Sequence, residues 1–443
     1  MKIEWKLILF IIISVVFSST PLVKISYAAN DWKINKIISN NINPSYLQLS
    51  SAKSGYGLVW VDNREADLEL YYSRINSNGK SVGREIKLTD NEVHDETPAL
   101  VWNGKGFALF WSYSRNQIYF TLFKENGKKI IENKSLGVQS RGYAIHVSAV
   151  WNGEEYGVTW WDVRDAPSCN PPGTRGRAFF ARVDKNGNMI GEEIPVSDAF
   201  SNPWQDYHPL MIWDGENYAI FWGDSREGGE CTGGVGDGNI YLAKVNKNGE
   251  KILSDIKLQS NELSPQLWDV EWDGENYVIG YNGRIAQGHL AKMDVSGNTI
   301  LVDVPINSGN QGGSPMITSY DNKYYIAWSD FRDRTPETFY NTEIYYTITD
   351  KNGDKLTPET RLTFQDDSQA SNTKIIFNKK SIGLAWLDFR SGSPQIYFAL
   401  DRINNIPKPS FNAPIFSLIP TSPPIPTAPP IPTILPFPTN LPF

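Results

Sequence analysis

Three shortages limit what this chain of 443 residues can be. It has only two cysteines and four histidines, and no Cys/His pair suited to nucleophilic catalysis. It has no basic excess, since its net charge is −7, and a surface that binds nucleic acid needs one. The body of the chain shows no helical periodicity of any length. These shortages predict an all-β protein whose main partner is not a nucleic acid.

The chain also lacks the common catalytic signatures. It contains no Gly-x-Ser-x-Gly elbow, no His-Glu-x-x-His pair and no phosphate-binding loop. Its Asp-Lys-Asn-Gly turns lack the alternating acidic residues and the distal Glu of a calcium loop. We therefore expect no catalytic residue of these classes, no metal and no cofactor. Paired carboxylates for glycoside chemistry are an alternative, carried by loop residues expected on one face: Asp95, Glu96, Asp206, Glu262 and Asp366.

What the chain has in abundance is repetition. A core of Trp-x-Asp-x-Arg, preceded by two apolar runs and followed by an aromatic strand and an Asn-Gly turn, occurs five times. The five copies begin at Trp60, Trp160, Trp222, Trp328 and Trp386. Two worn copies begin at Trp111, which keeps the Arg but not the Asp, and at Tyr281. Repetition at intervals of 47 to 62 residues predicts an array of like units with about four short strands each.

The fourth unit shows the expected strands clearly. Apolar runs at 208–213 and 218–223 flank an Asp-Gly turn, and a third run covers 239–245 after a Gly-rich loop. The fourth strand, at 251–258, is more polar, as an outer edge strand needs to be. Seven such units predict a seven-bladed β-propeller of four-stranded antiparallel blades over residues 30–404.

The two ends of this array complement each other. The last unit has no fourth strand, because a proline-rich segment follows its third strand at 395–403. A spare strand precedes the first unit, at 32–40, and its sequence is similar to the other fourth strands. We expect this N-terminal strand to complete the last blade, which would close the ring and remove its open edges.

The Trp-x-Asp-x-Arg motif is predicted to be architectural. Its three residues alternate along a strand, so their side chains point to one face. The Trp can fill the contact between blades, the Asp can cap the following loop, and the Arg can pair with that Asp or with a neighbouring one. A catalytic site needs one such constellation, whereas an architecture needs one per blade.

Both termini differ from the repeats in composition. Residues 1–29 begin with Lys2 and Lys6, continue with an apolar run at 7–17 and have small residues at Ser26 and Ala28, which predicts an export signal or an uncleaved anchor. Residues 405–443 are rich in proline and carry one charge, Lys408, which predicts a disordered, extended tail. We therefore expect a secreted or cell-surface monomer that touches a membrane only through such an anchor.

The two cysteines occupy related places. Cys169 and Cys231 lie in the loops that follow the motif in consecutive repeats. A propeller puts these loops side by side on one face, and an even number of cysteines in an exported protein suggests a disulfide. We expect a Cys169–Cys231 bridge between blades three and four, with two separate thiols as the alternative.

Residues that break the repeat are the candidates for function. Insertions gather in the loops after the second strand of units three, four and six and in the loop entering unit four, all on one face. Two histidines, each five residues before a Trp, occupy equivalent places in adjacent blades. With nearby aromatic and polar residues, which suit a sugar or a peptide, they form the predicted ligand site: His146, Trp204, Asp206, Tyr207, His208 and Trp268. The alternative is that both histidines only satisfy backbone groups at strand starts.

The recurring Trp-x-Asp-x-Arg, Ile-Tyr and Asn-Gly elements over residues 32–404 resemble those of exported bacterial β-propeller repeat proteins of the sialidase-like superfamily. Sialidases of that superfamily carry Ser-x-Asp-x-Gly-x-x-Trp boxes and a cluster of three arginines. This chain has no such box, and its arginines recur around the ring instead of clustering. The resemblance therefore implies the fold and not the activity.

These observations favour a noncatalytic, exported propeller that binds a glycan or a protein on its loop-rich face. A glycan-active enzyme, either a hydrolase or a lyase that uses loop carboxylates with His146 or His208, is the alternative. A purely structural surface protein is a third hypothesis.

Overall fold

The computed structural model describes residues 32–38, 43–65, 67–138, 140, 142–164, 176–200, 208–226, 238–283, 286–309, 311–335, 341–364 and 368–403. Contacts divide the chain into two units, Met1–Ile403 and Asn404–Phe443. The second unit, the predicted export signal and both cysteines lie outside the described residues. Within the described ranges, the regular elements are all β-strands, and no helix is long and apolar enough to cross a membrane.

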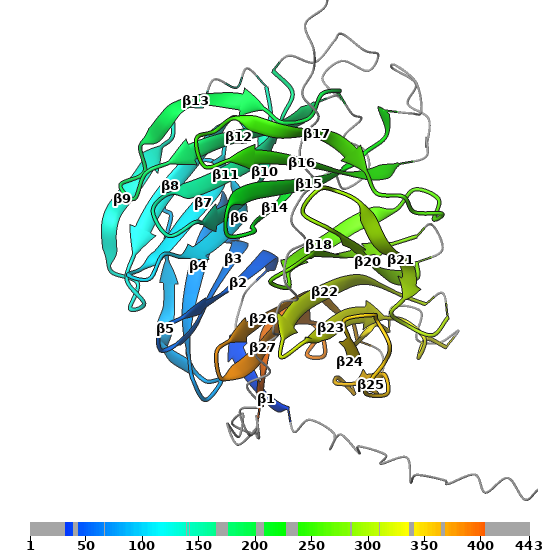
Figure 1. Cartoon of the computed structure of the whole chain (residues 1–443). Helices are drawn as coiled ribbons and strands as arrows, with labels where there is room; N and C mark the ends of the chain where they lie inside the picture. Colours follow the sequence, from blue (N-terminus) through cyan, green and yellow to red (C-terminus); the bar gives the residue numbers. More distant parts are fainter. Residues whose placement is uncertain are drawn as a thin grey trace, which may run out of the picture. The chain divides into compact units, whose positions relative to one another are not determined.

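The 28 strands form seven antiparallel sheets of four strands each, arranged as blades around a ring (Figure 1). The innermost strands are β2 Pro44–Ala52, β6 Asp95–Trp102, β10 Ala144–Trp151, β14 Leu210–Trp213, β18 Gln266–Trp272, β22 Gly312–Tyr320 and β26 Ala370–Asn378. The second strands are β3 Gly55–Glu65, β7 Phe107–Tyr113, β11 Tyr156–Asp162, β15 Asn217–Asp224, β19 Tyr277–Asn282, β23 Lys323–Asp330 and β27 Ser381–Asp388.

The outer half of each blade follows in the same order. The third strands are β4 Asp67–Asn76, β8 Gln117–Phe123, β12 Arg177–Val183, β16 Asn239–Asn246, β20 Gly288–Met293, β24 Glu343–Asp350 and β28 Gln395–Arg402. The outermost strands are β5 Ser81–Lys87, β9 Lys129–Ser135, β13 Met189–Pro195, β17 Lys251–Lys257, β21 Thr299–Pro305, β25 Thr360–Arg361 and, in the seventh blade, β1 Lys33–Ile38. The predicted seven-bladed, all-β propeller is confirmed.

The ring closes as the sequence predicted. Strand β1 pairs antiparallel with β28, in a register that sets Lys33 opposite Leu400. The seventh blade also packs on the first, because the rings of Tyr56 and Phe398 lie 5.1 Å apart. The hydroxyl of Tyr56 is also hydrogen-bonded to Ser381. The N-terminal strand therefore removes the edge that the last blade would otherwise expose.

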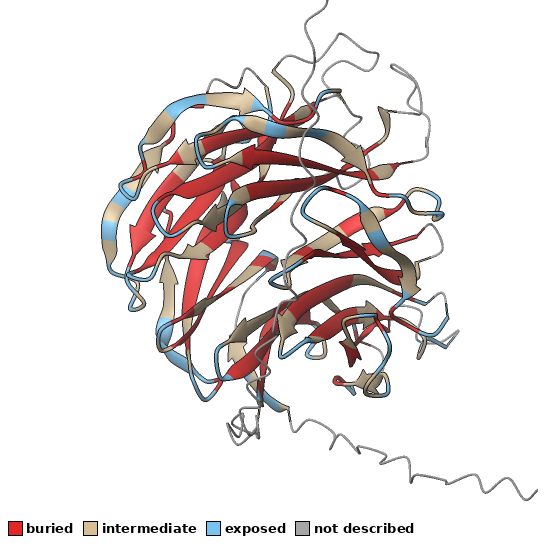
Figure 2. Cartoon of the chain, viewed as in Figure 1, coloured by how far each residue is buried: buried red, intermediate tan, exposed pale blue. Residues whose placement is uncertain are grey.

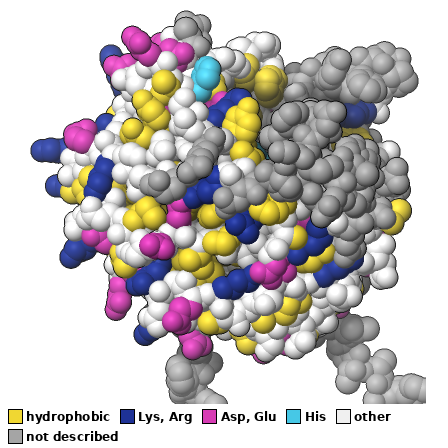
Figure 3. All heavy atoms as spheres, turned by 90° about the horizontal axis from the view of Figure 1, so that it is seen from above, with side chains coloured by type: hydrophobic (Ala, Val, Ile, Leu, Met, Phe, Trp, Pro, Cys, Tyr) yellow, Lys and Arg dark blue, Asp and Glu magenta, His cyan; other side chains and the backbone are white. Residues whose placement is uncertain are grey.

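The core lies between blades. Each of the seven blade interfaces has its own cluster of buried apolar side chains, drawn from the facing sheets of two neighbouring blades. Figure 2 shows the inner strands mostly buried and the outermost strands carrying the exposed positions. On the face seen in Figure 3, basic and acidic side chains are interspersed, with hydrophobic ones between them. Burial between sheets explains why the inner strands read as continuous apolar runs.

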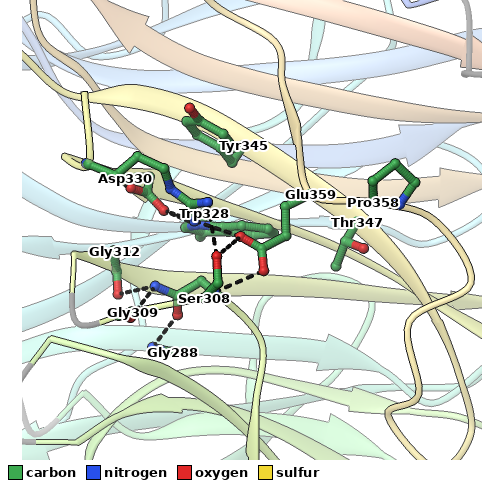
Figure 4. Close-up of polar contacts among 12 residues, drawn as sticks. Gly288, Ser308, Gly309, Gly312, Trp328, Asp330, Tyr345, Thr347, Pro358 and Glu359 are labelled. Atoms are coloured by element: carbon green, nitrogen blue, oxygen red, sulfur yellow. Dashed lines mark hydrogen bonds and ion pairs between the residues drawn. The ribbon is translucent and has the colours of Figure 1, made fainter.

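The repeated motif forms a clip at the end of the second strand in the five blades that keep it whole. In blade six, Asp330 accepts hydrogen bonds from Trp328 Nε1 at 2.8 Å, from the Arg332 amide at 2.9 Å and from Arg332 Nη2 at 2.5 Å (Figure 4). The guanidinium also pairs with Glu359 of the outer loop at 2.7 Å and lies over the Tyr345 ring. The same arrangement recurs at Asp62, Asp162, Asp224 and Asp388. The motif therefore fastens these five blades internally, as predicted.

In blade two, two acidic residues of the innermost strand take the place of the missing motif Asp. Trp111 Nε1 donates to Asp95 Oδ1 at 2.7 Å, and Arg115 binds Glu96 through two bonds of 3.0 and 2.8 Å. The expectation that Asp95 and Glu96 are loop carboxylates free for glycoside chemistry is therefore wrong. Both lie buried in β6, because the lost motif Asp left two donors that these carboxylates satisfy. Burial raises the pKa of Asp95 to about 6.

Candidate functional site

A cavity of about 600 Å³ opens at the centre of the ring. It lies on the face where the innermost strands begin and the second strands end, which is the face predicted to carry the long loops. Every blade contributes to its wall through the start of its innermost strand or the residues just before it. Convergence of seven blades on one cavity makes this the natural place for a ligand in a propeller.

One position per blade lines this cavity at a fixed place in the repeat. It lies 14 residues before the first residue of the motif core, and in chain order it is occupied by Tyr46, Thr97, His146, His208, Leu267, Ser314 and Asn372. We call these seven residues the mouth ring. The motif residues are the same in five blades, whereas the side chains of the mouth ring differ from blade to blade. A repeated position with varied side chains is where such a fold can acquire specificity.

A β-bulge sets the backbone of the mouth ring in five blades. At each bulge, two residues of the innermost strand face the single Trp of the second strand, and the first of the two has positive φ. The five φ values are 48° at Tyr46, 48° at Thr97, 59° at His146, 60° at Ser314 and 54° at Asn372. Such a conformation costs about 1–3 kcal/mol for a residue other than Gly, and bulges re-aim side chains near functional sites.

Side chains hold this arrangement from blade to blade. An innermost strand pairs on one side only, so its other edge presents unpaired amides. Side-chain oxygens of the preceding blade accept these hydrogen bonds. They run from His146 N to Thr97 Oγ1 at 3.1 Å, Met211 N to Ser148 Oγ at 3.2 Å, Ile317 N to Asp269 Oδ2 at 2.7 Å and Phe377 N to Thr318 Oγ1 at 3.1 Å. The cavity wall is therefore a braced structure and not a set of independent strands.

The two predicted histidines meet at the cavity wall. The ring centroids of His146 and His208 lie 3.7 Å apart, and the rings are tilted by 36°. Burial, together with His208 and Arg115, lowers the pKa of His146 to about 2. This imidazole is therefore neutral near pH 7, where it can donate and accept hydrogen bonds but cannot act as a cationic acid.

Three residues of the cavity wall carry buried polar atoms without a hydrogen-bond partner within the described ranges. They are His146 Nδ1, Trp268 Nε1 and Thr373 Oγ1. Native proteins satisfy nearly all such atoms, so these three are the groups of the wall best placed to hydrogen-bond a ligand.

Two acidic residues lie deeper along β18. Asp269 accepts the Ile317 amide, and Glu271 accepts the Ser319 amide at 3.0 Å and the Ser319 hydroxyl at 2.9 Å. Burial raises the pKa of Asp269 to about 6 and that of Glu271 to about 7. Neither residue lines the cavity. Their carboxyl groups therefore join blades five and six and do not face the open mouth.

The structure brings together His146, His208 and Trp268 of the predicted ligand site, all of which line the cavity. Trp204, Asp206 and Tyr207 lie outside the described residues, as do Asp366 and the predicted Cys169–Cys231 bridge. Glu262 remains a loop residue, and its carboxylate lies 3.4 Å from His289 Nε2. Within the described ranges, no group of three His, Cys, Asp or Glu residues could hold a metal ion.

Sequence reasoning missed the rest of the mouth ring. Tyr46, Thr97, Leu267, Ser314 and Asn372 belong to it as firmly as the two histidines. The signal was present as the constant spacing of 14 residues to each motif core. The histidines stood out only because the chain has so few of them.

No family model matches this sequence, and no curated protein matches it. Among solved structures, the phage phi92 endosialidase is 9% identical with a TM-score of 0.49, covering 85% of this chain and 70% of that one. A subtype N10 neuraminidase-like protein of A/little yellow-shouldered bat is 9% identical with a TM-score of 0.44, covering 70% and 96%. Trypanosoma rangeli sialidase is 9% identical with a TM-score of 0.43, covering 84% and 60%. These neighbours are sialidase-like β-propellers, and the likeness concerns the fold alone.

Proposed function

We propose that this chain is an exported, noncatalytic β-propeller that binds a glycan in the cavity of the mouth ring. The observation that carries the proposal is the contrast within the repeat. The backbone of the mouth ring recurs in five of the blades, while its side chains vary and converge on one cavity. A conserved scaffold with varied side chains suits recognition better than architecture.

The chemistry of the wall supports a sugar as the ligand. Aromatic residues such as Tyr46, Trp268 and Phe331 offer flat apolar surfaces to a sugar ring. Uncharged hydrogen-bonding side chains such as Gln48, Asn282 and Gln369 offer donors and acceptors to hydroxyl groups. A wall that combines apolar faces with a few neutral hydrogen-bonding groups suits a sugar.

The test uses the full chain with a panel of insoluble polysaccharides, scoring both retention on the solid and release of new chain ends. Retention without release is the expected result. Replacing His208 and Trp268 with Ala should weaken retention, while Glu154→Ala, an exposed turn residue after an innermost strand, serves as the control. If no polysaccharide is retained, a protein partner or a purely structural role takes the place of this proposal.

A second candidate function is a glycan-active enzyme, which the raised pKa values of Asp269 and Glu271 favour. Carboxylic acids that stay protonated near pH 6–7 can serve as general acids. Against this stand their hydrogen bonds to blade six and their absence from the cavity wall. Under the enzyme hypothesis, Asp269→Asn or Glu271→Gln would abolish product release and leave retention intact.

A further inference from the structure

Lys374 is the feature of the cavity that the proposed function does not use. It lies on β26 at the first position after the bulge, and its side chain lines the cavity. Its ammonium makes no hydrogen bond and no ion pair with any residue in the described ranges; Asp269 influences it only at longer range. Burial lowers the pKa of Lys374. Partial burial of an ammonium without an ion-pair partner costs free energy, because the charge loses water and gains no counter-charge.

No described carboxylate makes an ion pair with this ammonium. Strands β2, β22, β23, β24 and β27 contact β26, and the acidic residues of these strands bind other groups. Asp330 and Asp388 bind the Trp and Arg of their own motifs, Glu343 binds Arg361 and Thr363, and Asp350 accepts amides of the turn that follows it. Asp269 accepts the amides of Ile317 and Val270 and attracts Lys374 only through its charge. The cavity wall itself contains two basic residues, Lys374 and Arg334, and no Asp or Glu among its described members. The site is therefore locally cationic in a chain whose net charge is −7.

We propose that the ligand of the mouth-ring cavity carries an anionic group, a carboxylate or a sulfate, and that Lys374 is the residue that binds it. This inference rests on the proposed function and narrows it from glycans in general to acidic glycans. The negative net charge of the chain repels polyanions elsewhere on its surface, so the local charge of the cavity would also make the binding selective.

The test compares charged and neutral forms of the same polymer at constant ionic strength. The carboxylate arm uses polygalacturonate and its methyl ester, and the sulfate arm uses dextran sulfate and dextran. At least one charged form should bind the full chain about tenfold to a hundredfold more tightly than its neutral counterpart, as expected for hydrogen bonds to a charged group. The arm that shows the preference identifies the acidic group.

The variants assign that preference to one side chain. Lys374→Met keeps an unbranched side chain of similar length without the charge and should remove the preference, while Lys374→Arg keeps the charge and should retain most of the preference. Lys105→Met makes the same charge change at an exposed turn after β6 and should have no effect. The melting temperature of each variant shows whether it is folded, and Lys374→Arg tests the inference if Lys374→Met is not.

Three results would overturn the inference: equal binding of charged and neutral polymers, binding of neither polymer in both arms, or a preference that survives Lys374→Met. The first of these would leave the proposed function intact, because a neutral glycan would still bind. If the polysaccharide panel shows retention of a neutral polysaccharide and no charged form binds, the glycan-binding proposal stands and the preference for acidic glycans is wrong.

Discussion

At the scale of single residues, the motif Asp has the clearest energetic role. Asp330 is fully buried and holds three donors from Trp328 and Arg332. Replacing it with Ala removes one of the two carboxylates that bind Arg332 and leaves a buried indole N–H without an acceptor. We expect Asp330→Ala to lower the free energy of unfolding by about 3 kcal/mol. Urea denaturation measures this change.

A matched control lies in the same blade. Asp354 is exposed in the turn after β24, and Asp354→Ala should change the free energy of unfolding by less than about 0.5 kcal/mol. Equal effects of the two substitutions would show that the clip contributes nothing beyond a surface charge.

The deep acidic residues give a pH dependence with a definite sign. The pKa of Asp269 rises from 3.8 to about 6 on folding, and that of Glu271 rises from 4.5 to about 7. The folded state therefore binds more protons than the unfolded state between about pH 4 and 7, so each group destabilises the fold as the pH rises through this window. Asp269→Asn and Glu271→Gln should reduce the loss of stability between pH 4 and 7. Melting temperatures that fall equally in wild type and variants would contradict this account.

At the scale of elements, β1 is the strand on which closure depends. Its pairing with β28 was predictable, because the last repeat lacked an outer strand and the N-terminus offered one. Deleting residues 30–41 should lower the melting temperature by more than about 10 °C or prevent folding, since the seventh blade would keep an open edge. Deleting 405–443, a separate unit, is the control and should change little. Equal melting of the two truncated chains would refute closure by β1.

Small residues control how closely the blades approach. Gly157 of β11 faces blade four, where a Cβ atom would lie 2.5 Å from the Tyr218 ring. Gly157→Ala should therefore cost about 1–3 kcal/mol through overpacking, measurable by thermal denaturation. An unchanged melting temperature would mean that the interface yields without cost.

The bulges show where sequence reasoning stopped. Alternation and Asn-Gly turns predict strands, and the recurring Trp-x-Asp-x-Arg predicts blades, because these signals are local and chemically constant. The positive φ at Thr97 and Tyr46 arises only when the blades are assembled. It could not be predicted from the sequence, because neither Thr nor Tyr favours this conformation. The worn motif of blade two misled in the same way, since Asp95 and Glu96 reveal their partners only when the sheet is formed.

At the scale of the whole molecule, the residues that repeat between blades and the residues that differ between blades lie in different places. Buried clips and aromatic contacts recur in the interior, whereas the channel mouth gathers the side chains that differ between blades. The fold class could be predicted because the pattern of strands and turns, which is weak in one unit, recurs in seven units. The site could be predicted only in part, because residues far apart in sequence converge there.

The loops of blades three and four carry one more prediction at this scale. Cys169 and Cys231 follow the clips of Arg164 and Arg226 in adjacent blades. A thiol assay on the unfolded, unreduced protein should find no free thiol if they are bonded. Two thiols per chain would remove the bridge.

The most direct test of the central claim is an alanine scan of the mouth ring, reading affinity for whichever polysaccharide the chain retains. The reference is a set of exposed turn residues on the opposite face, Glu154, Glu216 and Glu275. We predict that losses of affinity are confined to the mouth ring. Melting temperatures should remain near that of wild type except for Leu267→Ala, which removes a buried side chain from the core between blades four and five. Losses confined to the opposite face, or affinity unchanged at every mouth-ring position, would contradict the account.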